Sequence, residues 1–148
     1  MQSRPRVVAN DKAYVLDEQV GHLLRRAHQR HTSIFQGSIG DSQLTPLQFA
    51  ALVKLSDLGE VSQNHLGRLT AMDAATMQGV IRRLFARRLI ERRPDPTDRR
   101  GVLLQLSPNG TTLLATCIAN GFTVSERTLE PLNPSKRTSL LDMLRRIS

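Results

Sequence analysis

The chain has 148 residues, 39% of them hydrophobic, and carries 21 Lys+Arg against 13 Asp+Glu, a net charge of +8. A domain of this length buries about 68–70% of the surface that its unfolded chain exposes, so it needs no metal to fold, and Cys117 has no second cysteine to pair with. No apolar run approaches the ~18 residues that a membrane span requires, and Met1–Asp11 lacks the apolar stretch of a secretion signal. We expect one cytoplasmic domain over residues 1–148, without a membrane partner, metal or cofactor.

Helical periodicity and capping residues predict that most of the chain is helical. Apolar residues at helical spacing from Val15 to Phe35 predict a long first helix, which we expect to break over 37–42. A capping residue followed by proline predicts that further helices start at Thr45-Pro46, Ser107-Pro108 and Asn133-Pro134.

The middle of the chain predicts two closely joined helices followed by a hairpin. Ser62 and Asp73 are expected to cap the third and fourth helices. The short extended segments Leu89–Arg93 and Val102–Leu106 are separated by a turn cluster at Pro94–Asp98 that no helix could cross. This order is typical of a winged helix-turn-helix, so the predicted fold class is mainly α with a small β-hairpin wing.

The positive charge is concentrated in one segment and is nearly all arginine. Only Lys12, Lys54 and Lys136 are lysines, and eight arginines fall between Arg82 and Arg100. The planar guanidinium suits contacts with phosphates and base edges. On charge alone, a solvated basic face and a nucleic-acid interface fit this run equally well.

The predicted fourth helix has one apolar stripe and an opposite face of small and cationic residues. The stripe is Met77, Val80, Ile81, Leu84 and Phe85; the opposite face is Ala75, Gly79, Arg82, Arg83 and Ala86, flanked by Thr76 and Gln78. Glycine in a helix costs about 0.5–1 kcal/mol relative to alanine, and close approach to the DNA major groove would offset that cost. Glutamine suits adenine, arginine suits guanine or phosphate, and an alanine methyl suits thymine. A solvated helix that contains a glycine is the alternative.

Two further segments resemble the MarR family of transcriptional regulators. Asp95–Gly101 (DPTDRRG) followed by Leu104–Gly110 (LQLSPNG) is similar to the wing of that family, and Leu66–Leu69 and Val80–Leu84 fall where it has its paired DNA-binding helices. The resemblance covers nearly the whole chain. It implies a homodimer in which helices from 14–36 and 108–148 interlock, while a DNA-binding lobe at 45–106 reads half of a pseudo-palindromic operator.

The same resemblance implies which residues meet DNA. The recognition-helix contacts fall on Ala74, Ala75, Thr76, Gln78, Gly79, Arg82 and Arg83, and the phosphate contacts on Ser62 and Gln63. Arg99 or Arg100 would enter the minor groove, and Asp98 would orient one of them through an ion pair. For Arg92 and Arg93 we favour general attraction to the DNA backbone.

Regulators of this family usually sense a small molecule, often an anionic or phenolic aromatic. On the first helix His31 lies within the apolar arc, His28 at its edge and Arg25 outside it. The segment Tyr14–His28 resembles members that control aromatic-acid catabolism. An arginine with two histidines would suit an aromatic carboxylate, so we expect a repressor that such a ligand releases. A hydrogen-bonded core histidine is the alternative for His31.

Three other functions find less support in the sequence. A thiol-based redox sensor needs a reactive cysteine, but Cys117 lies in an apolar stripe typical of packing. An enzyme is not expected, because the sequence has no phosphate-binding glycine loop and no metal-ligand spacing. A sequence-neutral architectural DNA-binding protein remains open, and it would show no preferred operator.

Overall fold

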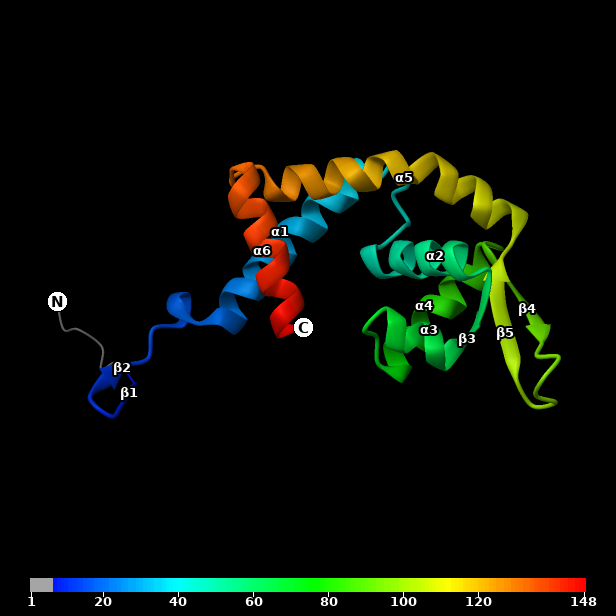
Figure 1. Cartoon of the computed structure of the whole chain (residues 1–148), viewed down its shortest axis with the longest axis horizontal. Coiled ribbons are helices and arrows are strands. Elements are labelled where there is room, and N and C mark those ends of the chain that lie inside the picture. Colours follow the sequence, from blue (N-terminus) through cyan, green and yellow to red (C-terminus); the bar gives the residue numbers. More distant parts are fainter. Residues whose placement is uncertain (1–6) are drawn as a thin grey trace.

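The computed structural model describes residues 7–148, so the first six residues of the expected domain lie outside it. Long helices form one layer, and a lobe of shorter helices and strands lies beneath one end of that layer (Figure 1). None of the helices in the described range is both long and apolar enough to cross a bilayer. In chain order the elements are β1 (Val8–Ala9), β2 (Lys12–Ala13), the 3-10 turn η1 (Leu16–Glu18), α1 (Val20–Ser38), α2 (Pro46–Leu58), β3 (Glu60–Ser62), α3 (Gln63–Leu69), α4 (Ala74–Ala86), β4 (Ile90–Pro94), β5 (Val102–Leu106), α5 (Pro108–Leu129) and α6 (Pro134–Ile147).

The predicted capping residues begin their helices. In each case the side-chain oxygen accepts a hydrogen bond from the backbone N–H three residues later, which satisfies one of the free donors at a helix start. The five capping residues are Thr45, Ser62, Asp73, Ser107 and Asn133. The predicted starts of α2 to α6 are therefore confirmed.

The prediction for the first helix was wrong at both ends. Residues 16–18 form a separate 3-10 turn, and Gln19 has an extended ψ of 135°, so α1 begins at Val20. The helix also runs through Gly37. Phe35 and Ile39 are both buried one turn apart, which holds the last turn in place, and the left-handed residue that follows is Gly40 (φ +89°).

The sheet of the lobe has one strand more than the predicted hairpin. β4 and β5 pair as expected, but β5 also pairs with β3, giving an antiparallel sheet in the order β3-β5-β4. Val61 on β3 lies opposite Leu104 on β5, and both side chains are buried. A three-residue strand between two helices shows no alternation, so the sequence pattern missed it, as it missed the two-residue strands β1 and β2.

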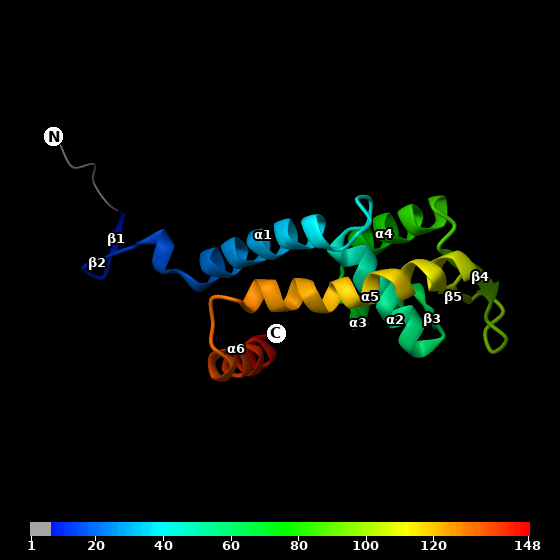
Figure 2. The ribbon, with the colours of Figure 1, turned by 90° about the horizontal axis from the view of Figure 1, so that it is seen from above.

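The buried side chains are concentrated in the lobe. The apolar stripe of α4 is buried as predicted, with Phe85 partly exposed. The helical layer is different: α1 and α5 lie side by side (Figure 2), yet α6 has no buried residue and much of the apolar surface of the layer is exposed. Its exposed apolar side chains include Leu23, Leu24, Ile118, Phe122, Leu141, Met143 and Ile147.

Candidate nucleic-acid interface

The recognition helix α4 presents its small and cationic side chains to solvent. Its buried stripe packs on the lobe, and the Asp73 carboxylate fixes its start by accepting the Thr76 N–H at 2.7 Å. This hydrogen bond keeps the pKa of Asp73 below its usual range. Of the residues assigned to base contacts, Thr76 and Gly79 are partly buried and the others are exposed: Ala74, Ala75, Gln78, Arg82 and Arg83.

Gly79 is not required by the fold of this chain. Among the described residues, a Cβ at that position would meet only Nη1 of Arg83, at an ordinary contact distance of 3.5 Å. The backbone there is helical, so an alanine would improve the helix. The bare patch at Gly79 is therefore consistent with close approach of a second molecule, as the sequence predicts.

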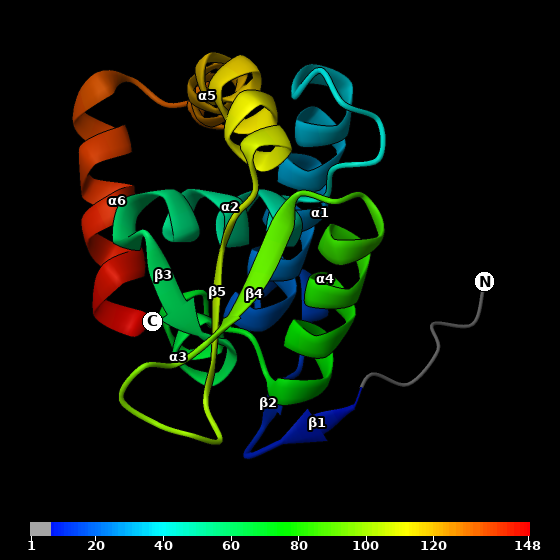
Figure 3. The same cartoon turned by 90° about the vertical axis from the view of Figure 1, so that its right-hand side faces the viewer.

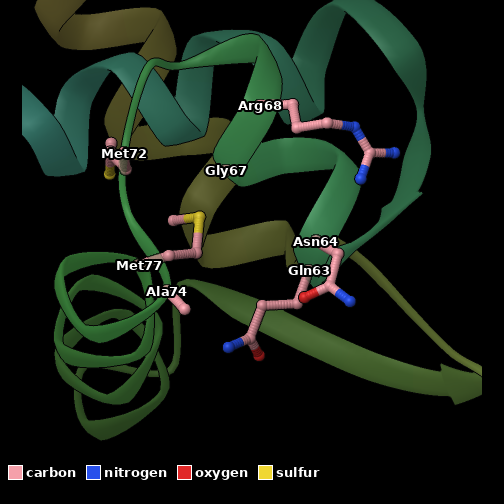
Figure 4. Close-up of a pocket in the computed structure, with 7 residues that line it drawn as sticks. All are labelled: Gln63, Asn64, Gly67, Arg68, Met72, Ala74 and Met77. Carbon is pink, nitrogen blue, oxygen red and sulfur yellow. The ribbon is translucent and has the colours of Figure 1, made fainter.

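A concavity of about 260 Å³ lies between α3 and the start of α4 (Figure 4). The side chain of Gln63 extends toward Ala74, so these two predicted DNA contacts are brought together. Asn64 and Arg68 also line it, on the outer side of α3. Sequence reasoning missed both, although their i and i+4 spacing places them on one exposed face of a helix. Ser62 accepts the His65 N–H, which leaves its own hydroxyl proton for a phosphate oxygen.

Short-range hydrogen bonds shape the tip of the wing. Asp95 Oδ1 accepts both the backbone N–H and the hydroxyl of Thr97 at 2.8 Å. These bonds hold the pKa of Asp95 below its usual range. A Cβ on Gly101 would lie 3.0 Å from the Asp95 Cβ, so a glycine closes the loop without a clash.

The expected ion pair of Asp98 is absent from the part of the chain that the structure describes. Its Oδ1 instead accepts the backbone N–H of Arg100 at 3.0 Å. The reason is local, because an aspartate in a turn readily accepts the N–H two residues on. Arg99 and Arg100 are both exposed, and neither guanidinium is ion-paired within residues 7–148. Asp98 thus positions the backbone of the tip rather than an arginine side chain.

The two arginines of β4 differ in their surroundings. Arg93 forms a two-pronged ion pair with the carboxylate of Glu60 on β3, across the central strand. The guanidinium keeps the pKa of Glu60 below its usual range. Arg92 instead lies over the ring of Phe85, 4.3 Å from its centroid, and within residues 7–148 no carboxylate forms an ion pair with it. General attraction to DNA therefore fits Arg92 better than Arg93.

A groove of about 600 Å³ separates the recognition helix from the helical layer. Much of the α4 face assigned to DNA also forms one wall of this groove. The lining residues are His28, Thr32 and Gln36 on α1, Thr45, Pro46 and Leu47 at the start of α2, and Ala75, Thr76, Gly79, Val80, Arg82 and Arg83 on α4.

The three residues expected to bind a ligand do not form one site in the single chain. His28 lines the groove. His31 faces a second cavity, of about 460 Å³, between α1, α5 and α6; His28 also lines this cavity, and the ring centroids of the two histidines are 6.4 Å apart. Arg25 is exposed and lines neither the groove nor this cavity.

The protonation of His31 follows from its hydrogen bonds. The Thr128 hydroxyl donates to the Val124 carbonyl, so it accepts from Nδ1–H of His31 at 2.9 Å. Burial, and then the neighbouring His28, lower the pKa of His31, so its ring is neutral at physiological pH. A hydrogen-bonded packing role is thus evident for this histidine.

Cys117 is only 3% exposed and packs in the core, as the sequence predicts. Within residues 7–148, no three side chains suited to metal binding lie together.

Comparison with known proteins adds a consistent set of relatives. The model of the MarR family matches residues 42–101. The chain is 46% identical over 134 residues to the HTH-type transcriptional repressor NicR of Pseudomonas putida, covering 90% of this chain and 85% of that protein. It is 44% identical to Bordetella bronchiseptica BpsR, whose structure concerns regulation of DNA binding by 6-hydroxynicotinic acid (TM-score 0.86; 92% and 97% covered). The repressor CouR bound to a 23-mer DNA duplex is 30% identical (TM-score 0.80; 89% and 94% covered). These relatives are regulators of transcription rather than enzymes.

Proposed function

Because the chain belongs to the MarR family of transcriptional regulators, we propose that it is a repressor which binds a pseudo-palindromic operator as a homodimer and which a small aromatic carboxylate releases. The observation that carries the proposal is the exposed face of α4. It combines arginines and a glutamine with an unneeded glycine, and it also forms a wall of the groove. One surface can therefore serve both DNA and ligand.

The arrangement of the lobe supports a role in reading DNA. The wing tip and the first turns of α3 and α4 lie toward the same edge of the lobe (Figure 3). With α4 in the major groove, Gln78 would contact adenine, and Arg82 or Arg83 would contact guanine or phosphate. Arg99 or Arg100 would then reach the minor groove, as the family resemblance implies. The related repressor CouR was solved bound to a 23-mer DNA duplex, which supports double-stranded DNA as the partner here.

The exposed apolar surface of α1, α5 and α6 supports a homodimer. A soluble monomer rarely exposes so many large apolar side chains on one layer of helices, and a second copy of the chain would cover them. Two lobes related by a two-fold axis then present two recognition helices. Their half-sites should lie about one helical turn apart, or 10–10.5 bp.

The groove between α1 and α4 is the site that we propose for the effector. The relative BpsR responds to 6-hydroxynicotinic acid, an aromatic carboxylate, which supports the same ligand class here. His28 on α1 and Arg82 or Arg83 on α4 offer hydrogen-bond donors across the groove. A carboxylate held between α1 and α4 would favour an arrangement of the lobes that binds DNA less tightly. Arg25 would join the site only in the dimer. His31 would not contact the ligand in the groove but would pack beside His28.

Binding measurements test this function directly. Selection from random duplexes should yield a two-fold symmetric operator, and 6-hydroxynicotinic acid should weaken binding to it. Gln78→Ala should cost about 1–3 kcal/mol on that operator and relax one base position, whereas Arg92→Ala should weaken all sequences about equally. If selection returns no preferred sequence, the protein is instead a sequence-neutral DNA-binding protein.

A further inference from the structure

The loop that joins α1 to α2 is fastened to the helical layer. The side-chain amide of Asn120 on α5 donates to the carbonyl oxygen of Ile39 at 3.0 Å. Ile39 itself is fully buried. A Cβ on the next residue, Gly40, would lie 2.9 Å from Nδ2 of Asn120, and its φ of +89° is one that side chains rarely adopt, so glycine suits this point of the loop. The loop therefore leaves the layer from a fixed position.

The same loop also binds the residue that ends the recognition helix. Both carboxylate oxygens of Asp41 accept from the guanidinium of Arg87, the C-cap of α4, at 2.7 and 3.2 Å. The two side chains are only 18% and 27% exposed. Asp41 also accepts the N–H of Gln43, which fixes the carboxylate within the loop. The ion pair thus connects the helical layer to α4 without passing through DNA-contacting residues.

The groove proposed for the effector is framed by the segments that this loop joins. Gln36 on α1 lines it shortly before the loop, and Thr45 lines it directly after. The opposite wall is α4, which the loop holds at Arg87. A molecule in the groove therefore contacts the segments on both sides of the ion pair.

We propose that Asp41 and Arg87 form a pivot that sets the position of α4 relative to the helical layer and transmits occupancy of the groove to DNA affinity. This inference rests on the proposed function. A ligand shifts an equilibrium only between arrangements that it binds with different affinity, so the lobe must have defined arrangements. The ion pair would define these arrangements, because α4 can rotate about its Arg87 end but cannot move away from the loop at that end. Both are positioning residues, since neither lines the groove.

The first test of the pivot needs no effector. A cysteine in place of Ala74, an exposed residue at the far end of α4 from Arg87, carries a spin label, while the buried Cys117 stays unlabelled. Pulsed electron paramagnetic resonance then measures the distance between the two recognition helices of the dimer. Asp41→Asn should broaden the distance distribution. Asp57→Asn, the same charge change at an exposed position of α2, should leave it as in wild type.

The second test measures the coupling itself. In wild type, saturating 6-hydroxynicotinic acid should weaken operator binding by a factor within the usual range of about 5–150. Asp41→Asn and Arg87→Gln should each reduce that factor to less than about 3, while calorimetric affinity of the DNA-free protein for the acid changes by less than about 3-fold. Because Asp41 and Arg87 act as one pair, the double variant should lose no more of the effector response than either single variant does.

Two results would overturn the pivot: an unbroadened distance distribution in Asp41→Asn, or a full effector response in that variant. If the ion pair were purely structural, Asp41→Asn would lower the melting temperature but leave the distance distribution and the effector response of the folded protein unchanged. That outcome too would overturn the pivot. If wild type binds its operator but ignores the acid, the proposed effector fails instead. The distance measurement alone then decides the pivot.

Discussion

Replacing Glu60 by glutamine should make the protein bind DNA more tightly at low salt, because it releases an arginine that the wild type holds. Glu60 and Arg93 form a two-pronged ion pair on the wing sheet. Both side chains are partly exposed, 36% and 42%, so the pair contributes little to stability and the variant should fold normally. Glutamine keeps the size of the side chain while removing its charge. Arg93 is then available to a DNA phosphate.

The size of the effect follows from counterion release. Each additional phosphate contact changes the slope of log affinity against log salt by about −0.9. Between about 50 and 200 mM salt, the variant should therefore lose about 3.5-fold more affinity than wild type. The gain in affinity is thus largest at the low-salt end and is independent of sequence.

The assay is fluorescence anisotropy with a random-sequence duplex over a series of salt concentrations. Glu91→Gln is the matched control, because Glu91 lies on the same strand as Arg93 but its carboxylate accepts from Gln105 rather than from an arginine. Both variants change the net charge equally. If their salt slopes are the same, Glu60 does not hold Arg93 away from DNA and the reasoning is wrong.

Three further outcomes are expected. Gly79→Leu should abolish operator binding in anisotropy while the melting temperature stays at or above that of wild type, and loss of the fold would contradict this assignment. Gly110→Ala should destabilise the protein by about 1–3 kcal/mol in urea unfolding, because its Cβ would collide with the Leu89 carbonyl oxygen; unchanged stability would mean that α5 can shift. The Arg87 hydrogen bonds lower the pKa of Asp41, so its stabilisation is present above the unfolded pKa of about 3.9 and lost as pH falls through the lower folded value. The stability difference between wild type and Asp41→Asn should accordingly shrink from pH 7 to pH 3, and a constant difference would exclude the ion pair as its cause.

Local signals in the sequence predicted the recognition helix well. An aspartate cap and a stripe of apolar residues at helical spacing act within a few residues, and α4 begins and packs as they indicate. The turn residues between the two strands of the hairpin are also a local signal, so the sequence predicted β4 and β5. β3 was not, because three residues are too few to show alternation and its partner β5 lies about forty positions away in the chain.

The pairing of charges could not be predicted for the same reason. Arg93 appeared to be one cation in a basic run, but the fold brings Glu60 to it from another strand. Asp98 is next to two arginines in the sequence, yet in the structure its carboxylate accepts a backbone N–H of the turn. The groove was missed as well, since its walls come from three separate helices. Sequence reasoning placed His28 on the relevant helix but could not show what faces it.

The connection between the wing and α5 has a mechanical consequence. Strand β5 ends at Leu106, and Ser107 alone separates it from α5. That serine donates its N–H to the Leu89 carbonyl and its hydroxyl to the Arg88 carbonyl, so the junction is also bonded to the residues that follow α4. Wing, recognition helix and α5 thus meet at a hydrogen-bonded junction that contains no flexible linker. Inserting base pairs between the half-sites cannot be absorbed by stretching a tether, so operators with altered spacing should be rejected outright rather than bound with gradually declining affinity.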